Sequence, residues 1–238
     1  AVYLAWELLS QDEAGRVQGG VPNTETPKGI WGEVVREVDA GGNVVWEWRS
    51  TCLIDRFAIH RNASRAEYGH ANTLCVTPSG DYLVSFKNLN LLMIVSRQSG
   101  DVIWEYQDDA LGGQHDAQVT ETGTVLVFAN GLYSSDLLHS KVLEIDPATN
   151  EIVWKYVQRD NPMAFFSPHI SGCQRLATGH TLICEGAKGC IFEVTPNGDV
   201  VWEFVNPEWG DHPKFGPMNW VFRARRYAVD SPQIQNRI

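Results

Sequence analysis

"TPNGDVVWEFVNP", residues 195–207, decides the fold, because its turn and its aromatic strand occur three more times in the chain. The related stretches are AGGNVVWEW at 40–48, SGDVIWEY at 99–106 and ATNEIVWKY at 148–156. They carry the tryptophans Trp46, Trp104, Trp154 and Trp202. These tryptophans recur at intervals of about 50 residues, a period typical of propellers and solenoids. The period predicts a fold built from similar units.

The segments between the tryptophans have the pattern of short strands, with almost no helix. Three of them form hairpins that turn at a glycine, which supplies the positive φ that a tight turn requires. The hairpins are TLCVTPSGDYLVSF (73–86), AQVTETGTVLVFAN (117–130) and CQRLATGHTLICEG (173–186). A third strand follows each hairpin, and the tryptophan strand comes fourth. The third strands are LLMIVSR (91–97), SKVLEID (140–146) and GCIFEVT (189–195).

Four antiparallel strands per unit, repeated around an axis, form the blades of a β-propeller. The sequence therefore predicts an all-β fold, a β-propeller of four-stranded antiparallel blades, in a single domain over 1–238. Each tryptophan would lie on the outer strand and fill the wedge between blades, where burial of an aromatic side chain stabilises by about 1.5–3 kcal/mol. The expected parts are a partial blade at 1–50, blades at about 70–107, 114–157 and 171–205, and a closing strand at 219–229.

The composition argues against several classes of protein. A net charge of −10 argues against nucleic-acid binding. The chain has no apolar run as long as a membrane-spanning helix needs. Its five cysteines form no CxxC pair, so we expect no zinc site, and most lie in apolar runs where Cys packs as a small core residue. A Gly-rich phosphate loop of the P-loop type is also missing from the sequence.

Three histidines stand where the innermost strands of the predicted blades begin. His70 lies in GHANT, His115 in GQHDAQ and His169 in SPHISGCQ. Innermost strands line the central channel of a propeller, so residues at their beginnings meet at one mouth. Imidazole is both a nucleophile and a proton shuttle near neutral pH, which favours covalent transfer chemistry at such a cluster. The alternative for each histidine is a hydrogen-bonded residue that only supports the start of a strand.

Taken in order, these stretches resemble the bacterial arylsulfotransferase (aryl-sulfate sulfotransferase) family of β-propellers. The resemblance covers nearly the whole chain and is carried by GHANTLCVTPSGDYLVSFKNLNLLMIV, GQHDAQVTETGTVLVFANG, SKVLEIDPATNEIVWKY, SGCQRLATGHTLICEGAKGCIFEVTPNGDVVWEFVNP and VFRARRY. The family propeller is six-bladed, so this chain would cover about four blades' worth. By that template AVYLAWE matches the second strand of a blade, and the family's histidine just upstream of that strand has no counterpart here.

The resemblance also implies roles for single residues. The family uses an H-x-N pair, a basic residue after it and a separate histidine that becomes sulfated. Residues 70–72 match the pair, and His115 is the best match to the sulfated nucleophile. Lys87 stands where the pattern usually has Arg, which keeps the charge but loses the bidentate fork. The expected catalytic residues are His115, His70, Asn72 and Lys87, and the expected substrate-binding residues are His169 and Gln174.

The predicted function is transfer of a sulfuryl group from a phenolic sulfate ester to a phenol through a sulfo-histidine, with ping-pong kinetics and no nucleotide donor or other cofactor. The expected partners are the aryl sulfate and the phenol, without nucleic acid or membrane. A second copy or a partner chain is expected if the ring is incomplete, since that would expose a sheet. The resemblance favours a periplasmic or secreted location. The alternatives are a non-catalytic propeller that binds a ligand or protein, and a metal site made by the histidines.

Overall fold

Four antiparallel sheets make up most of the structure. The computed structural model describes residues 1–134, 137–231 and 234–235. The first sheet has three strands, in the order β1 (Val2–Leu8), β3 (Trp31–Val38) and β4 (Val44–Arg49). The other three sheets are β6 (Ala71–Val76), β7 (Tyr82–Phe86), β8 (Leu91–Val95) and β9 (Val102–Gln107); β10 (His115–Val119), β11 (Val125–Ala129), β12 (Lys141–Asp146) and β13 (Glu151–Tyr156); and β14 (Gly172–Arg175), β15 (Thr181–Glu185), β16 (Cys190–Val194) and β17 (Val200–Val205). Each of these four-stranded sheets is a meander in which chain neighbours pair.

The inner hairpins turn at the glycines that the sequence indicated. Gly80, Gly123 and Gly179 have φ values of 88°, 86° and 82°. Each donates its N–H to the carbonyl three residues earlier, at 2.9, 3.0 and 2.9 Å. A side chain disfavours this left-handed conformation and glycine does not, so the three turns form where glycine is placed.

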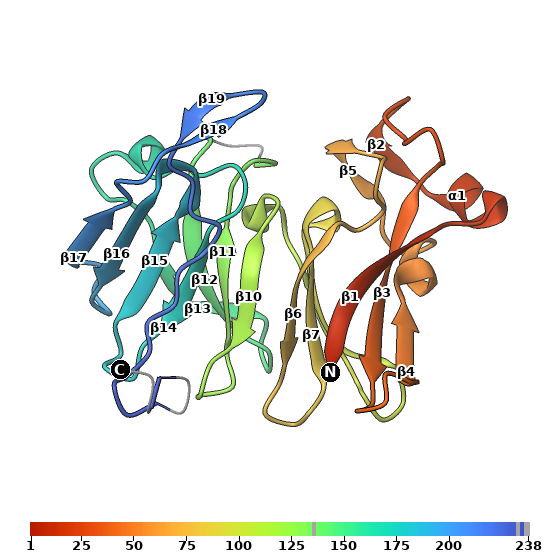
Figure 1. Cartoon of the computed structure of the whole chain (residues 1–238), viewed down its shortest axis with the longest axis horizontal. Coiled ribbons are helices and arrows are strands. Elements are labelled where there is room, and N and C mark those ends of the chain that lie inside the picture. The colour runs from red at the N-terminus through yellow and green to blue at the C-terminus, as the bar shows by residue number, and fades with distance from the viewer. Residues whose placement is uncertain (135–136, 232–233, 236–238) are drawn as a thin grey trace.

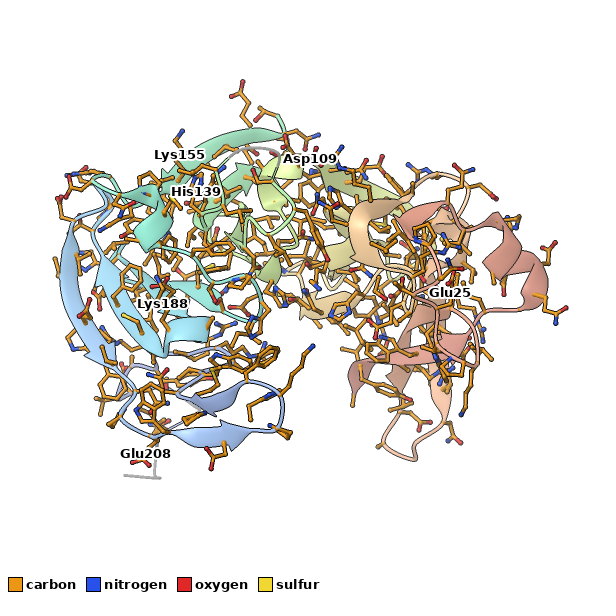
Figure 2. The ribbon with its side chains drawn as sticks, turned by 90° about the horizontal axis from the view of Figure 1, so that it is seen from above. Glu25, Asp109, His139, Lys155, Lys188 and Glu208 are labelled. Atoms are coloured by element: carbon orange, nitrogen blue, oxygen red, sulfur yellow. The ribbon has the colours of Figure 1, made fainter. Side chains whose placement is uncertain are left out.

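Apolar side chains fill the spaces between successive sheets, which Figure 2 shows fanned out in an arc. The second strands β7, β11 and β15 are buried at every position, which explains their uninterrupted apolar runs. Successive side chains of a strand point to opposite faces. Thus β7 sends Val84 to the core against the first sheet and Leu83 to the core against the third. In the same way β11 sends Val127 to one side and Leu126 to the other.

The tryptophans of the outer strands reach across to the following sheet. Trp104 on β9 donates its Nε1–H to Asn150 Oδ1, in the turn before β13, at 2.7 Å. Trp154 on β13 donates to the Pro196 carbonyl, in the turn before β17, also at 2.7 Å. Both indoles are half-buried. Each one therefore fastens its own sheet to the next by a hydrogen bond as well as by packing.

The first and last tryptophans differ in burial. The ring of Trp46 is half-buried and lies 4.9 Å from the ring of Tyr82 in the second sheet. Trp202, on β17, is 42% exposed, with the guanidinium of Arg226 4.7 Å above its ring. The prediction that all four tryptophans belong to the core is therefore wrong for Trp202, because the described residues place no further sheet against β17.

The remaining elements are short. They are α1 (Gln11–Arg16), β2 (Gly19–Val21), β5 (Ile59–Ser64), β18 (Gly210–His212), β19 (Gly216–Met218), and the 3-10 helices η1 (Ser50–Leu53), η2 (Lys87–Leu89), η3 (Asp109–Leu111), η4 (Pro162–Ala164) and η5 (Gly186–Lys188). β2 and β5 pair in parallel, and β18 and β19 form a hairpin that Figure 1 shows above the β14–β17 sheet. None of the helices in the described ranges is long and apolar enough to cross a bilayer.

The closing strand expected at 219–229 is not present in the structure, where this segment has an irregular backbone. Its contacts explain why. Its Phe222 carbonyl accepts from the Ser171 N–H at 2.9 Å, ahead of β14. Further along, the side-chain amide of Gln174 both donates to the Arg226 carbonyl and accepts from the Arg226 N–H. A side chain thus takes the place of a backbone ladder beside β14.

Antiparallel meanders stacked face to face in an arc are the blades of a β-propeller, and the chain has this all-β fold. The first of the four sheets has three strands, and the arc is open within the described part of the chain. The first strands of the sheets, β1, β6, β10 and β14, lie next to one another (Figure 1). The residues just before β6, β10 and β14 therefore come together at the same end of these strands, whereas β1 runs in the opposite direction, so that Trp6, near its end, lies beside His70.

Candidate functional site

The innermost strands begin with a backbone feature that the sequence did not show. His70, directly before β6, has a φ of 49°; Asp116, second in β10, has 57°; and Ile170, two residues before β14, has 51°. Left-handed backbone is uncommon for residues other than glycine and clusters at functional sites, where surrounding contacts hold it in place. Each of these positions is next to, or is itself, one of the predicted histidines.

His115 is almost fully buried, at 6% exposed, and its ring nitrogens have different environments. Nδ1 lies 2.8 Å from Asn130 Oδ1. The Asn130 amide nitrogen donates to the Ser167 and Ile170 carbonyls at 2.8 and 3.0 Å, which fixes the amide with its oxygen toward the histidine. Nδ1 must therefore carry the proton, so that Nε2 holds the lone pair. Nε2 has no side-chain partner among the described residues, and the Gly113 backbone also bonds to the ring, which raises its pKa in the same sense as Asn130 does.

The electrostatic surroundings keep His115 neutral. Burial is the largest effect and lowers the pKa of His115 to about 4. The hydrogen bond to Asn130 opposes this shift, while the positive charges of Lys87 and His70 add to it. Because a low pKa leaves the imidazole unprotonated near neutral pH, Nε2 is available as a nucleophile without prior loss of a proton.

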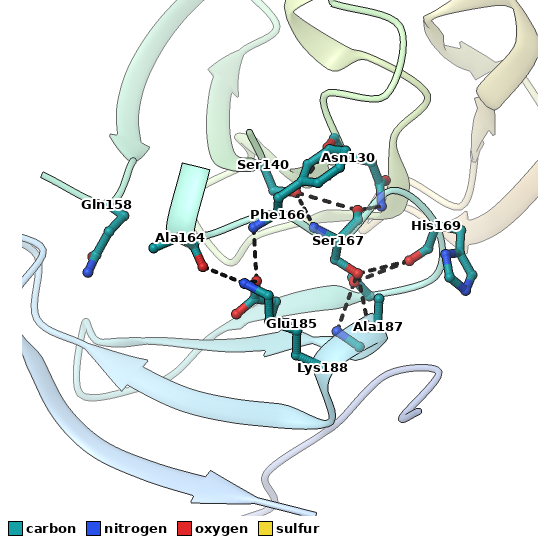
Figure 3. A network of polar contacts seen from close by, with 12 residues as sticks. Asn130, Ser140, Gln158, Ala164, Phe166, Ser167, His169, Glu185, Ala187 and Lys188 are labelled. Atoms are coloured by element: carbon teal, nitrogen blue, oxygen red, sulfur yellow. Dashed lines mark hydrogen bonds and ion pairs between the residues drawn. The ribbon is translucent and has the colours of Figure 1, made fainter. Parts of the chain in front are cut away.

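Asn130 also ties His115 to the loop before β14. Its nitrogen bonds to that loop, and Ser140 Oγ donates to the Asn130 carbonyl at 2.9 Å (Figure 3). The Ser167 N–H in turn donates to Ser140 Oγ at 2.9 Å. Asn130 has none of its surface exposed. The orientation of the His115 ring is thus held by a buried network that joins two neighbouring sheets.

Lys87 brings a cation to the same region. It begins η2, and burial lowers the pKa of its ammonium, an effect opposed by the negative charge of Glu67. The ammonium lies 5.8 Å from the centre of the Tyr133 ring and makes no hydrogen bond or ion pair within the described part of the chain. Its charge lowers the pKa of both His115 and His169, so it lies near both of them. A mostly buried ammonium without a counterion in contact is suited to bind an anion.

His70 and Asn72 are tied to neighbouring groups. The Glu67 carboxylate contacts His70 Nδ1, which orients that ring. The buried Glu33 carboxylate accepts from the Gly69 N–H at 2.9 Å and holds the backbone just before His70. Asn72 Nδ2 donates to the Gln114 carbonyl at 2.7 Å. Asn72 therefore links β6 to the residue before His115, and this bond occupies one of its two amide protons.

His169 lies close to the cluster, whereas Gln174 does not. Burial, with the charges of Lys87 and His212, lowers the pKa of His169. Its ring packs edge-on against Trp220 at 4.5 Å, and its enclosed Nε2 has no hydrogen-bond partner in the structure as described. Figure 3 shows this ring at the margin of the Ser167 network, with only its carbonyl engaged. Gln174 lines a groove of about 420 Å³ near the hairpin turns, at the other end of the strands.

Sequence reasoning missed Asn130, Tyr133 and Arg225. Lys87 and Asn130 occupy the same position, directly after the second strand of their sheets. This shared position could have indicated Asn130 as a candidate, because Lys87 was already one. Arg225 donates to the buried Asp116 carboxylate at 2.8 Å, and Asp116 also accepts from the Cys173 N–H at 3.0 Å.

In the described ranges no three His, Cys, Asp or Glu side chains are grouped so that they could hold a metal ion. The arrangement therefore gives no support to the metal-site alternative.

Comparison with solved structures agrees with the propeller fold. A protein of unknown function from Bacteroides caccae is 18% identical, with a TM-score of 0.50 over 73% of this chain and 54% of that one. A streptogramin B lyase is 15% identical, with a TM-score of 0.50 over 87% of this chain and 59% of that one. Virginiamycin B lyase from Staphylococcus aureus is 13% identical, with a TM-score of 0.48 over 87% of this chain and 61% of that one. At such identities the likeness is one of fold alone, and the chain spans between half and two thirds of the length of these structures.

Comparison with protein families gives more than the fold. No curated protein matches the chain in sequence. The model of the family described as "Arylsulfotransferase (ASST)" matches residues 31–207. The matched range runs from β3 to just past β17 and includes His70, His115 and His169. Since this range is well over half of its length, the chain belongs to the arylsulfotransferase family.

Proposed function

We propose that this protein transfers a sulfuryl group from a phenolic sulfate ester to a phenol, through a sulfo-histidine formed on His115 and without a nucleotide donor. Family membership supports sulfotransferase chemistry in general. One observation carries the finer proposal: a buried, neutral imidazole whose Nδ1 is held by Asn130 lies close to an ammonium that has no counterion in contact within the described residues. The first group supplies a nucleophile and the second attracts a sulfate ester.

The reaction takes place in two displacements. In the first, the Nε2 lone pair of His115 forms a bond to sulfur, the bond from sulfur to the phenolic oxygen breaks, and the electron pair leaves with the phenolate. The positive charge that develops on the ring is shared with the Nδ1–H, which stays bonded to Asn130 Oδ1. In the second, the oxygen of the acceptor phenol attacks sulfur and its proton passes to water, while the N–S bond breaks and returns the electron pair to His115. Two steps of this kind give ping-pong kinetics.

The other residues act on charge and position. Lys87 neutralises the sulfuryl oxygens and provides a fixed positive charge where negative charge accumulates. His70, held by Glu67 and close enough to His115 to affect its pKa, adds a second donor. Asn72 fixes the backbone just before the nucleophile through its bond to the Gln114 carbonyl. His169, whose pKa the Lys87 charge also lowers, would contact the bound ester.

The test is release of nitrophenol from p-nitrophenyl sulfate in the presence of a phenol acceptor. We expect His115→Ala to lower kcat by ~10³-fold or more, since the covalent route is lost. The control is His139→Ala, because Nδ1 of that histidine bonds to the nearby Leu137 carbonyl and to no other group among the described residues. Peptide mass spectrometry after donor alone should show one added SO₃ on His115. Full activity in His115→Ala would overturn the mechanism, and no release by the wild type would favour a ligand-binding propeller.

A further inference from the structure

Tyr133 lies in the loop after β11, beside Lys87, and the proposed mechanism gives it no role. It is 7% exposed. One face of its ring stacks on the imidazole of His60, with ring centres 4.6 Å apart and an interplanar angle of 19°. The Lys87 ammonium lies over the ring at 5.8 Å. These two contacts hold the ring in a fixed orientation.

Glycines bring this loop against the segment that precedes His115. A Cβ on Gly112 would lie 2.5 Å from the Gly131 Cα, so the two backbones touch at a distance that no side chain permits. The Leu132 N–H donates to the Gly112 carbonyl at 2.8 Å. A Cβ on Gly113 would lie 3.1 Å from Tyr133 Cε2 and 3.6 Å from Lys87 Cγ. Tyr133 therefore packs against both the segment leading to the nucleophile and the stem of the lysine.

The hydroxyl of Tyr133 is the part of this side chain that remains unused. Buried tyrosines normally give their O–H a partner, and Tyr68 donates to the Phe57 carbonyl at 2.8 Å in this way. The Tyr133 hydroxyl has no hydrogen bond within the described residues, and it is not one of the fully enclosed polar atoms that lack a partner. It is therefore reached from outside, on a ring that the Lys87 ammonium lies over, so a ligand atom would be its partner.

We propose that Tyr133 is a further residue of the transfer site, and that its O–H donates a hydrogen bond to the phenolic oxygen of the aryl sulfate while Lys87 holds the sulfuryl oxygens. This inference rests on the proposed function. When the bond from sulfur to oxygen breaks, negative charge builds up on the phenolic oxygen, so the hydrogen bond is strongest in the transition state. In the second displacement the same donor positions the oxygen of the acceptor phenol.

Tyr133 donates without giving up its proton. Burial raises the pKa of Tyr133 to about 12, whereas an ordinary phenol of the tyrosine type has a pKa of about 10. The proton therefore remains on Tyr133, and the leaving phenolate takes its proton from water. A hydrogen bond of this kind matters most for a basic leaving group, which carries more charge on oxygen, and least for nitrophenolate, whose ring withdraws that charge.

The experiment compares Tyr133→Phe with the wild type on phenyl sulfate and p-nitrophenyl sulfate, with the same acceptor. The substitution keeps the ring and its contacts with His60 and Lys87. We expect kcat/KM to fall ~10–100-fold for phenyl sulfate, the loss of one oxyanion donor, and about threefold or less for p-nitrophenyl sulfate. Tyr156→Phe is the matched control, because that hydroxyl bonds to Gln158, away from the site, and should change neither value.

The outcomes separate this inference from the function on which it rests. Equal losses on both esters, or no loss on either, would overturn the role of Tyr133 while leaving transfer through His115 intact. No transfer by the wild type with either ester would overturn both. Retained activity of Tyr133→Phe on p-nitrophenyl sulfate shows at the same time that the variant is folded.

Discussion

Replacing His115 with Gln should make the stability of the protein less sensitive to acid. His115 is neutral in the folded state, because burial lowers its pKa from 6.5 to about 4. Above pH 6.5 neither state holds the proton, and the group has no effect on the pH dependence of unfolding. Between pH 6.5 and pH 4 only the unfolded chain binds the proton, so the folded state loses stability as the pH falls. Gln cannot titrate, and the variant lacks this contribution.

The size of the effect follows from the two pKa values. Each pH unit between them changes the free energy of unfolding by about 1.4 kcal/mol. From pH 7 to pH 5 the wild type should therefore lose about 2 kcal/mol more than His115→Gln. Down to pH 4 the difference should reach about 3 kcal/mol. Other groups titrate in both proteins, and their contributions cancel in the comparison.

The assay is urea unfolding of both proteins at pH 7 and pH 5, with the midpoint and the m value measured for each. An imidazole resonance that is present in the wild type, absent in the variant and titrates near pH 4 would give the folded pKa directly. Parallel pH dependence of the two proteins, together with an imidazole that titrates near 6.5, would refute a buried neutral His115. The reasoning that makes this histidine a nucleophile at neutral pH would fail with it.

Two further predictions concern the fold. Trp154→Ala should lower the free energy of unfolding by about 3 kcal/mol, because it removes packing and the hydrogen bond to the Pro196 carbonyl. Trp202→Ala should lower it by only about 1 kcal/mol, because that indole is 42% exposed. Urea unfolding of both variants and the wild type measures the two losses. Gly131→Ala should destabilise by well over about 2 kcal/mol, since its Cβ would lie 1.9 Å from a backbone oxygen at a φ of 74°. Gly80 has a φ of 88° and open space around it, so Gly80→Ala should lose only the roughly 1 kcal/mol that a side chain costs in left-handed backbone. Similar losses of unfolding free energy in both glycine variants would contradict the close contact at Gly131.

The strand pattern could be predicted because it depends on local chemistry. Glycines placed at 80, 123 and 179 turn the inner hairpins, and uninterrupted apolar runs form the second strands that are buried on both faces. The burial of Trp202 could not be predicted in the same way. Its indole has the same local sequence as the other tryptophans, and its exposure depends on whether another sheet lies against β17.

The candidate site could be predicted in part. The position of a histidine at the start of an innermost strand is a local property, and it located His70, His115 and His169. What those side chains bond to is not local. Asn130 reaches His115 because β10 pairs with β11, and Tyr133 packs against the segment before His115 because Gly112 and Gly131 let two loops touch. Nothing in either loop alone shows the contact between the loops. The amide of Asn72 is likewise occupied by a carbonyl from the next sheet.

The proposed chemistry and the stability of the protein depend on the same burial. In the proposed mechanism His115 can act as a nucleophile at neutral pH because desolvation lowers its pKa and keeps it unprotonated, and the same desolvation lowers stability in acid. A substitution that let water reach the ring would raise the pKa of His115 toward 6.5 and relieve the acid sensitivity, but it would also leave part of the imidazole protonated near neutral pH. The buried bond from Nδ1 to Asn130 limits how far the pKa can fall, since it favours the charged ring. Asn130 therefore fixes the tautomer and also stabilises the cationic ring that a sulfo-histidine requires.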